Sequence, residues 1–448
     1  MKKFQKKIKI NLLQYAEIAL NQFKYKKIKL IAFIIFTSLF IISIKLILNS
    51  NIVLFENKII NFINNAFNIN LSSNTPLFIL STLFYILFII GLSRPSNLNK
   101  ITESIYNAGI VNYARETAIF IVNYKNPADK NTMIYKFFTN STSLADWENN
   151  IEKIEILGFR VKDFKRIGTN KILLCLTKED LGNPTPKLWN NDYLLKNSNE
   201  FKISLGIDSF GEQEIWNMSI IPHGFIGGES NSGKSVLLKC ILGQALALNS
   251  EVYLADFKSG IDYEPIWHKY IPIASNLNDL FKLTEDLIGK YHFRTQLLYE
   301  AHVNNIDNYN KIMSKKMKHI IFAFDEVAQV YSINKKALSK EDQNLLAKIE
   351  NNIDKLASLG RAVGIHLVFS TQRPSADLIS GQTRTNLGYR ICFRADDILS
   401  NIVLDNTNAS KMIPKNARGI YISNINKKVS QGYWIDDFNK FFDENVKH

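Results

Sequence analysis

The stretch Gly228-Glu-Ser-Asn-Ser-Gly-Lys-Ser235 decides how the rest of this sequence is interpreted. It satisfies the pattern G-x-x-x-x-G-K-[ST], in which a glycine-rich loop wraps a chain of phosphates. A short apolar run that ends near Ile226 precedes the stretch, and the helix-like run 236–248 follows it. Strand, loop and helix in this order are the context in which the motif binds a nucleotide, so the sequence predicts a phosphate-binding loop here.

The loop supplies both backbone and side-chain contacts for a nucleotide. Backbone N–H groups of the loop and of the helix N-terminus meet the negative charge of the phosphates. We expect Lys234 to reach the β and γ phosphates of ATP, and the Ser235 hydroxyl to ligate Mg²⁺. The residues expected to bind the nucleotide are Gly228, Glu229, Ser230, Asn231, Ser232, Gly233, Lys234 and Ser235.

A second marker is the run His319-Ile-Ile-Phe-Ala-Phe-Asp-Glu326, a buried-strand pattern that ends in two acids. Carboxylates at the C-terminal end of such a strand lie beside the phosphate loop. Asp325 is therefore predicted to hold Mg²⁺, and Glu326 to orient and deprotonate the attacking water. The second acid favours hydrolysis over nucleotide binding alone, although an ordinary strand followed by a polar turn is the alternative.

A third run, 365–370, reads as another strand and delivers Thr371 and Gln372 at its C-terminal end, the edge where ligands of open α/β sheets bind. Gln372 is a candidate γ-phosphate sensor. From spacing alone a structural turn is an equal alternative for Gln372, and the same holds for Arg361 in Leu359-Gly-Arg-Ala-Val-Gly364.

The C-terminal half alternates short apolar runs with helical patterns from about residue 201 to 437. This alternation predicts an α/β domain with a mostly parallel sheet and helices on both faces. The candidate strands are 224–227, 252–255, 320–324, 365–370, 389–393 and 419–422.

Composition narrows the class of protein further. Hydrophobic residues make up 46% of the chain and charged residues 21%, which excludes a disordered protein. Lys and Arg outnumber Asp and Glu by 55 to 41, and the net charge of +14 should attract polyanions such as nucleic acid or acidic lipid headgroups. Cys175, Cys240 and Cys392 lie far apart, so neither a zinc site nor a disulfide framework is indicated.

Two apolar runs account for much of the hydrophobic content. Residues 30–48 would span roughly 28 Å as a helix, close to the thickness of a membrane core, and residues 77–92 are equally apolar. We expect two transmembrane helices within 30–93, joined by a short external loop. Lysines flank the first run and Arg94 and Lys100 follow the second, so both termini, including the basic segment 1–29 and the ATPase domain, are expected in the cytoplasm of a multi-pass cell-membrane protein. A cleavable signal peptide is the alternative for the first run.

The segment 101–200 is predicted to be a small α+β cytoplasmic domain followed by a linker. A helical stretch is expected around 106–122, and strands are expected at 154–161 and 171–177. Prolines and a polar run at 190–199 mark the linker. No candidate catalytic residue lies in this segment.

From about residue 205 to 433 the chain resembles the motor domain of the FtsK/SpoIIIE DNA translocases. The matching motifs are Ile221-Pro-His-Gly, Leu254-Ala-Asp-Phe-Lys258 and, most specifically, Ser358-Leu-Gly-Arg-Ala-Val-Gly-Ile-His-Leu-Val-Phe-Ser-Thr-Gln-Arg-Pro-Ser375. The resemblance implies a RecA-like P-loop ATPase over 201–448 that binds ATP and Mg²⁺ and forms a homo-hexameric ring around DNA. It also implies that Arg361 is an arginine finger in the neighbouring subunit's ATP site and that Gln372 is the sensor.

With two predicted spans and a single motor domain, the organisation looks like that of the TcpA-like coupling proteins of Gram-positive conjugative elements. That resemblance implies a membrane-anchored translocase that delivers DNA to a conjugative transfer channel, with a relaxase and channel proteins as partners. Three alternatives stay open: a chromosome-segregation translocase without an orientation-reading module, a type VII-like protein-export ATPase, and a tether that uses ATP as an assembly switch. Turnover stimulated by DNA separates the DNA motors from the tether.

Overall fold

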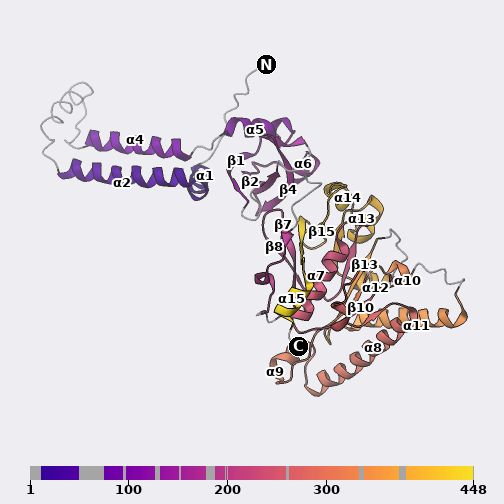
Figure 1. Ribbon diagram of the computed structural model, residues 1–448. Coiled ribbons are helices and arrows are strands. Elements are labelled where there is room, and N and C mark those ends of the chain that lie inside the picture. Colours follow the sequence, from indigo (N-terminus) through magenta and orange to yellow (C-terminus); the bar gives the residue numbers. More distant parts are fainter. Residues whose placement is uncertain are drawn as a thin grey trace, which may run out of the picture. The chain divides into compact units, whose positions relative to one another are not determined.

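The computed structural model describes residues 12–49, 75–93, 97–126, 132–150, 153–177, 187–196, 198, 200–258, 262–331, 338–372 and 380–446. The chain divides into two compact units, residues 1–178 and 179–448, each of which has its own core (Figure 1). The sequence places this boundary near residue 200 instead. The difference arises because β6 (Lys187–Leu188), inside the predicted linker, pairs with a strand of the second unit.

The second unit is built on one large mixed sheet. Its six parallel strands follow the order β11-β10-β12-β13-β9-β14. These strands are β9 (Gly224–Gly227), β10 (Glu251–Ala255), β11 (Ile273–Ala274), β12 (Ile320–Phe324), β13 (Ile365–Thr371) and β14 (Tyr389–Phe393). Five of the six coincide with predicted strands to within a residue, which confirms the α/β character of the domain.

Four antiparallel strands extend this sheet beyond β14 in the order β15-β16-β7-β8. They are β15 (Ile420–Ser423), β16 (Val429–Trp434), β7 (Lys202–Asp208) and β8 (Gln213–Asn217). The sheet is therefore mixed, whereas the sequence predicted a mostly parallel one. The connections 209–212 and 424–428 are too short for the crossover that parallel pairing needs, so these strands form hairpins.

Helices cover both faces of the sheet because the central strands are buried on both sides (Figure 1). Along β12, Ile320, Phe322 and Phe324 enter one core while Ile321 and Ala323 enter the other. The first core contains residues of α8 (Leu277–Glu300), α11 (Lys340–Leu359), α13 (Asp397–Leu404) and α14 (Asn408–Met412). The second contains residues of α7 (Lys234–Ala247) and α15 (Phe438–Asn445). The shorter helices α9 (Ile306–Ile312), α10 (Ala328–Tyr331) and α12 (Gly381–Asn386) also belong to this unit.

The first unit contains an antiparallel sheet in the order β1-β2-β5-β4-β3. Its strands are β1 (Ile119–Lys125), β2 (Thr132–Phe138), β3 (Glu155–Ile156), β4 (Phe159–Ile167) and β5 (Lys171–Thr177). Helices α5 (Leu98–Asn107) and α6 (Leu144–Asn150) pack on one face, with Trp147 fully buried. The helix predicted around 106–122 is wrong, because Gly109 at φ 85° follows the end of α5 and residues 119–125 form a strand.

Helix α1 (Leu12–Tyr25) covers the other face of this small sheet. Ile18 packs with Ile119 and Ile121, and the Gln22 amide donates to the Ile121 carbonyl at 2.7 Å. The Lys171 ammonium lies 2.6 Å from the Glu17 carboxylate. The segment predicted as a basic N-terminal tail thus contains a helix that is part of a folded unit.

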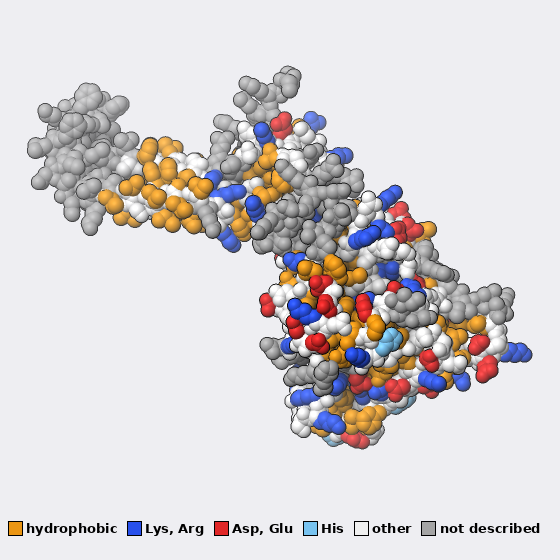
Figure 2. Space-filling model, in the orientation of Figure 1, with side chains coloured by type: hydrophobic (Ala, Val, Ile, Leu, Met, Phe, Trp, Pro, Cys, Tyr) orange, Lys and Arg blue, Asp and Glu red, His pale blue; other side chains and the backbone are white. Residues whose placement is uncertain are grey.

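Helices α2 (Lys27–Asn49) and α4 (Thr75–Ser93) coincide with the two apolar runs and pack on each other. The Phe36 and Phe88 rings stack at 3.7 Å between centroids, and the Thr37 and Tyr85 hydroxyls lie 3.0 Å apart. Figure 2 shows apolar side chains gathered on this pair. No helix in the described ranges combines the length and apolar character required to cross a membrane, so the predicted transmembrane helices are not supported. Most of the predicted external loop lies outside the described residues.

Candidate active site

The phosphate loop connects β9 to α7 through two glycines in left-handed conformations, Gly228 at φ 154° and Gly233 at φ 113°. A Cβ atom on Gly228 would lie 2.7 Å from the Phe393 Cβ, and one on Gly233 would lie 2.9 Å from the Gly419 backbone nitrogen. Neither position can therefore carry a side chain without a shift of the backbone. Tight packing against residues 393 and 419 explains why both glycines of the motif are present.

Lys234 is the first residue of α7 and is 5% exposed. Its ammonium donates to the Glu229 carbonyl oxygen at 3.3 Å. Burial lowers the pKa of Lys234 to about 8, although the carboxylates of Glu326 and Asp325 partly oppose this shift. The positive charge is only partly compensated by its surroundings, so an anionic phosphate beside it would stabilise it.

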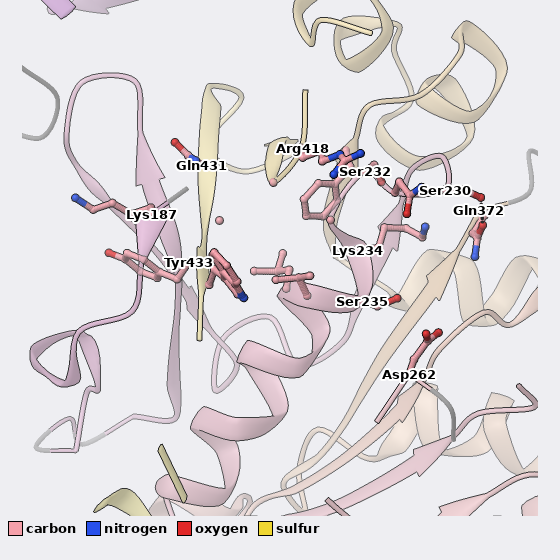
Figure 3. Close-up of a pocket in the computed structure, with 18 of the residues that line it drawn as sticks. Lys187, Ser230, Ser232, Lys234, Ser235, Asp262, Gln372, Arg418, Gln431 and Tyr433 are labelled. Atoms are coloured by element: carbon pink, nitrogen blue, oxygen red, sulfur yellow. Dashed lines mark hydrogen bonds between the residues drawn. The ribbon is translucent and has the colours of Figure 1, made fainter. Parts of the chain in front are cut away.

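A cavity of about 670 Å³ opens beside the loop (Figure 3). Four basic side chains from separate parts of the chain line it: Lys187, Lys234, Lys258 and Arg418. The loop residues from Ser230 to Ser235, together with Asp262, Gln372 and Tyr433, complete much of the lining. A cavity with this charge, at the N-terminus of α7, suits a ligand that carries several phosphates.

Asp325 follows β12 and is 2% exposed. One of its oxygens accepts a hydrogen bond from the Ser370 hydroxyl at 3.1 Å, while the other, Oδ2, has no hydrogen-bond partner among the described residues. Burial raises the pKa of Asp325, and the nearby Lys258 ammonium opposes that shift. A buried, unpaired carboxylate oxygen is a suitable ligand for Mg²⁺.

Asp325 and Ser235 therefore fit the predicted metal site. No cluster of three or more His, Cys, Asp or Glu side chains that could hold a metal ion occurs in the described part of the chain. Mg²⁺ is commonly bound through one or two protein ligands, with phosphate oxygens and waters filling its other positions. Two side chains are thus sufficient for a metal that arrives with the nucleotide.

Glu326 lies next to Asp325 and is held by the adjacent strand. The Thr371 hydroxyl donates to Glu326 Oε1 at 3.1 Å, and the Gln372 backbone N–H donates to Oε2 at 2.8 Å. The Gln372 side chain in turn accepts a hydrogen bond from the Ser230 hydroxyl at 2.6 Å. The structure therefore brings the predicted sensor, the predicted water-activating acid and the phosphate loop into direct contact.

Arg361 lies apart from this site. It follows the end of α11, is exposed, and precedes β13, whose other end carries Thr371. A seven-residue strand extends about 20 Å, so Arg361 is too distant to contact a nucleotide in its own subunit. A role in a neighbouring subunit stays a prediction.

Sequence reasoning missed several residues of the site. Lys187, Lys258, Asp262 and Arg418 line the cavity without having been predicted as ligands. Lys258 alone carried a usable signal, because it follows a predicted strand by three residues at the edge where ligands bind. Arg394 supports the loop by donating to the Glu229 carboxylate at 2.9 Å and to the Ser230 carbonyl at 3.0 Å.

The buried lysine of a phosphate loop, with an Asp-Glu pair two strands away and one strand between them, defines a P-loop ATPase. Residues 188–376, less than half of the chain, match the FtsK/SpoIIIE family. The family predicted from the sequence motifs is thereby confirmed.

Curated relatives include DNA translocases. The DNA translocase FtsK of Clostridium tetani is 30% identical over 261 residues, which cover 54% of this chain and 34% of that protein. The DNA translocase SftA of Bacillus subtilis is 29% identical over 258 residues, which cover 55% of this chain and 26% of that protein. The chain thus spans about a third or less of the length of these relatives.

Among solved structures, the pCW3 conjugation coupling protein TcpA, in its monomer form with ATPγS, is similar over nearly its whole length. The match has a TM-score of 0.56 and 26% sequence identity, and it covers 78% of this chain and 99% of that one. The likeness therefore extends beyond the segment that matches the family.

Proposed function

We propose that this protein is an ATP-driven DNA translocase that acts as a coupling protein in conjugative DNA transfer. The observation that carries the proposal is the similarity to TcpA over 99% of that chain, combined with a complete phosphate loop and Asp-Glu pair. The family domain supplies the motor, and the similarity to a conjugation coupling protein points to the process in which the motor works.

Hydrolysis follows from the positions of the side chains. The loop and Lys234 bind the β and γ phosphates of ATP, and Glu326 accepts a proton from a water molecule as its oxygen attacks the γ phosphorus. The bond from that phosphorus to the bridging oxygen breaks, and ADP leaves with the bonding electron pair. Asp325 and Ser235 would hold Mg²⁺, which when bound would supply positive charge beside the phosphate oxygens.

DNA as the transported molecule and a hexameric ring as the working form both belong to this proposal. The net charge of +14 favours binding to a polyanion. The distance of Arg361 from its own ATP site agrees with a finger that acts on the adjacent subunit. A relaxase and channel proteins are the partners that a conjugative coupling role requires.

Attachment to the cell membrane is a further part of the proposal. Apolar side chains on α2 and α4 lie open to solvent, including Ile31 at 56%, Ile41 at 59% and Phe84 at 61% exposure. Burying them in lipid would remove a large apolar area from water. If both termini are cytoplasmic, an impermeant thiol reagent on intact cells labels Asn65→Cys and leaves Asn199→Cys unlabelled; the reverse pattern contradicts this topology.

The alternative best supported by the comparisons is chromosome movement, because the curated relatives are DNA translocases. Both functions use the same ATPase chemistry and the same class of cargo. They differ in what fails when the gene is removed.

The purified full chain tests the motor. We expect ATP hydrolysis that duplex DNA stimulates, together with displacement of a third strand from a DNA triplex. The Lys234→Ala protein should show neither activity. Hydrolysis that neither duplex nor single-stranded DNA stimulates would contradict the translocase proposal.

Gene deletion in the host cell tests the process. For a coupling protein, deletion abolishes transfer of the conjugative element to recipient cells and leaves chromosome partition intact. Wild-type protein, but not Lys234→Ala, restores transfer. Normal transfer with chromosomes trapped at the septum would instead establish the chromosome-movement alternative.

A further inference from the structure

Hydrogen bonds made by the side chain and by the backbone of Gln372 connect the phosphate loop to the carboxylate proposed to activate water. The connection runs from the Ser230 hydroxyl to the Gln372 side chain at 2.6 Å and from the Gln372 backbone N–H to Glu326 at 2.8 Å. Thr371 closes it with a bond of 3.1 Å to the other oxygen of the same carboxylate. Figure 3 shows Ser230 and Gln372 facing each other at the cavity.

The Ser230 contact fixes the orientation of the Gln372 amide. The hydroxyl donates to Oε1, so the amide oxygen points at the loop residue. The NH₂ group is then the end of the amide that can donate to an anionic oxygen. Because Gln372 lines the nucleotide cavity, that orientation suits a γ-phosphate and is not needed for ADP.

The Thr371 contact fixes the Glu326 carboxylate. Thr371 is fully buried on β13, and Glu326 adopts a φ of 76°, which is uncommon for a residue with a side chain. The Glu326 backbone N–H also faces the Ser370 hydroxyl at 3.4 Å. The adjacent strand thus holds Glu326 through its backbone and through both carboxylate oxygens, in a backbone conformation that needs such support.

We propose that Thr371 and Ser230 are positioning residues for ATP hydrolysis: Thr371 orients the carboxylate that activates water, and the Ser230 side chain turns the Gln372 amide toward the γ-phosphate. This inference rests on the proposed ATPase function and assigns roles to two side chains that the P-loop pattern itself does not give. Neither hydroxyl takes part in the bond-making or bond-breaking steps of hydrolysis. Each acts through the residue that it holds.

The Thr371→Val variant tests the first role. Valine has nearly the same shape and suits a buried strand, but it lacks the hydroxyl. We expect kcat to fall about 10- to 100-fold while KM for ATP stays unchanged, because the carboxylate loses its orientation and the nucleotide loses no contact. Thr371→Ser keeps a donor and should retain most of the wild-type kcat.

Thr284→Val is the matched control, because Thr284 is equally buried and its hydroxyl donates to the Phe281 carbonyl at 2.9 Å and accepts from the Asn352 amide at 3.4 Å. It should leave kcat unchanged. Thermal unfolding and ATP-binding stoichiometry show whether each variant is folded. A folded Thr371→Val protein with wild-type kcat, or with an increase in KM as its only defect, overturns the role of Thr371.

Ser230→Ala tests the second role by nucleotide preference. We expect the ratio of ATP to ADP affinity to fall about 3- to 10-fold, because ADP does not need the Gln372 amide, whereas Ser230→Thr keeps the hydroxyl and should retain the wild-type ratio. An equal loss for both nucleotides would show that Ser230 contacts the nucleotide without acting through Gln372, and no change would show that it has no role. If the wild-type protein hydrolyses no ATP, the proposed function itself is contradicted.

Discussion

The two edges of the parallel strands differ in how far their polar groups are satisfied. At the C-terminal edge, Asp325 Oδ2 and the Ser232 hydroxyl are buried without hydrogen-bond partners among the described residues, and Lys234 is a partly compensated cation. At the N-terminal edge, the His319 and His366 rings lie 2.9 Å apart at their nitrogens, and His366 contacts the Pro222 carbonyl at 3.1 Å. The C-terminal edge, which we call the open edge, needs a ligand to complete its polar interactions. At the N-terminal edge, which we call the closed edge, His319 and His366 find partners within the fold. His223 at this edge accepts a hydrogen bond from the Leu367 N–H at 3.0 Å, and its Nε2 atom has no hydrogen-bond partner among the described residues.

The closed edge also supports the turn that carries Arg361. The Arg294 guanidinium donates to the Val363 carbonyl at 2.9 Å, and the Ile306 backbone N–H donates to the Ala362 carbonyl at 2.8 Å. Gly364, at φ 72°, lies so close to α9 that an added Cβ would meet Ile306 Cδ1 at 2.5 Å. A side chain on such a rigid turn is suited to precise contact with a second molecule.

The largest expected effect concerns Arg361. If it completes the ATP site of the adjacent subunit, Arg361→Ala should bind ATP normally and hydrolyse it about 10³- to 10⁵-fold more slowly. Mixed with Lys234→Ala protein, it should recover part of the activity, since one subunit then offers an intact loop and the other an intact finger. Phosphate release at several mixing ratios measures this recovery.

Subunit exchange, followed by fluorescence transfer between labelled copies, is the control for that mixture. Arg361→Lys is a second control, because a lysine keeps the charge but not the planar, multidentate donor geometry, and only partial activity is expected. If mixed assemblies form and turnover stays at the level of the separate mutants, the two edges do not cooperate across subunits.

A smaller effect is expected within the open edge alone. Glu326→Gln keeps the size of the side chain and removes the base, so hydrolysis should fall about 10²- to 10⁴-fold while ATP stays bound. Fluorescent-nucleotide titration and phosphate release separate the two steps. Loss of binding together with turnover would show that Glu326 maintains the loop and does not activate water.

The smallest effect concerns the closed edge and its histidines. Burial lowers the pKa of His366 to about 4 and that of His223 to about 3. The unfolded chain therefore binds more protons than the folded one as the pH falls below 6.5, so the free energy of unfolding decreases with falling pH. The expected loss between pH 6.5 and 5 is on the order of 1 to 2 kcal/mol for each histidine.

Thermal or denaturant unfolding of the protein at several pH values measures this loss. His366→Gln should show a shallower decrease over the same window, because one of the titrating groups is removed. His302→Gln, at an exposed position of the same unit, should follow the wild-type slope. Identical slopes for all three proteins would show that the histidines of the closed edge do not govern its acid stability.

The sequence predicted the open edge far better than the closed one. The phosphate loop is one contiguous stretch of the chain, and the Asp-Glu pair is another. The chemistry of each stretch restricts which residues can occupy it, as Gly228 and Lys234 illustrate. The hydrogen bonds from Thr371 and Ser230 join segments more than 40 residues apart, so no local sequence pattern predicts them. The packing of α1 on the small sheet was not predicted for the same reason, because it also joins segments that are far apart in the sequence.

Local geometry explains other errors of prediction. The strand predicted over 154–161 is a hairpin, because Leu157 at φ 54° and Gly158 at φ 78° form its two-residue turn. A leucine at such a position is uncommon, since turns of this type favour Asn, Asp or Gly. The antiparallel extension of the large sheet was missed because β7 and β8 precede the phosphate loop in the chain but lie beyond β16 in space.

Strand β13 begins just after the Arg361 turn and ends at Thr371, beside Glu326 and Gln372. It is buried along its whole length and paired on both sides, with β12 and with β9. Such a strand transmits an axial displacement from one end to the other with little loss. An axial displacement of Gln372 would therefore reach the Arg361 turn, and in the proposed ring it would link the ATP site of one subunit to the residue that it offers to the next.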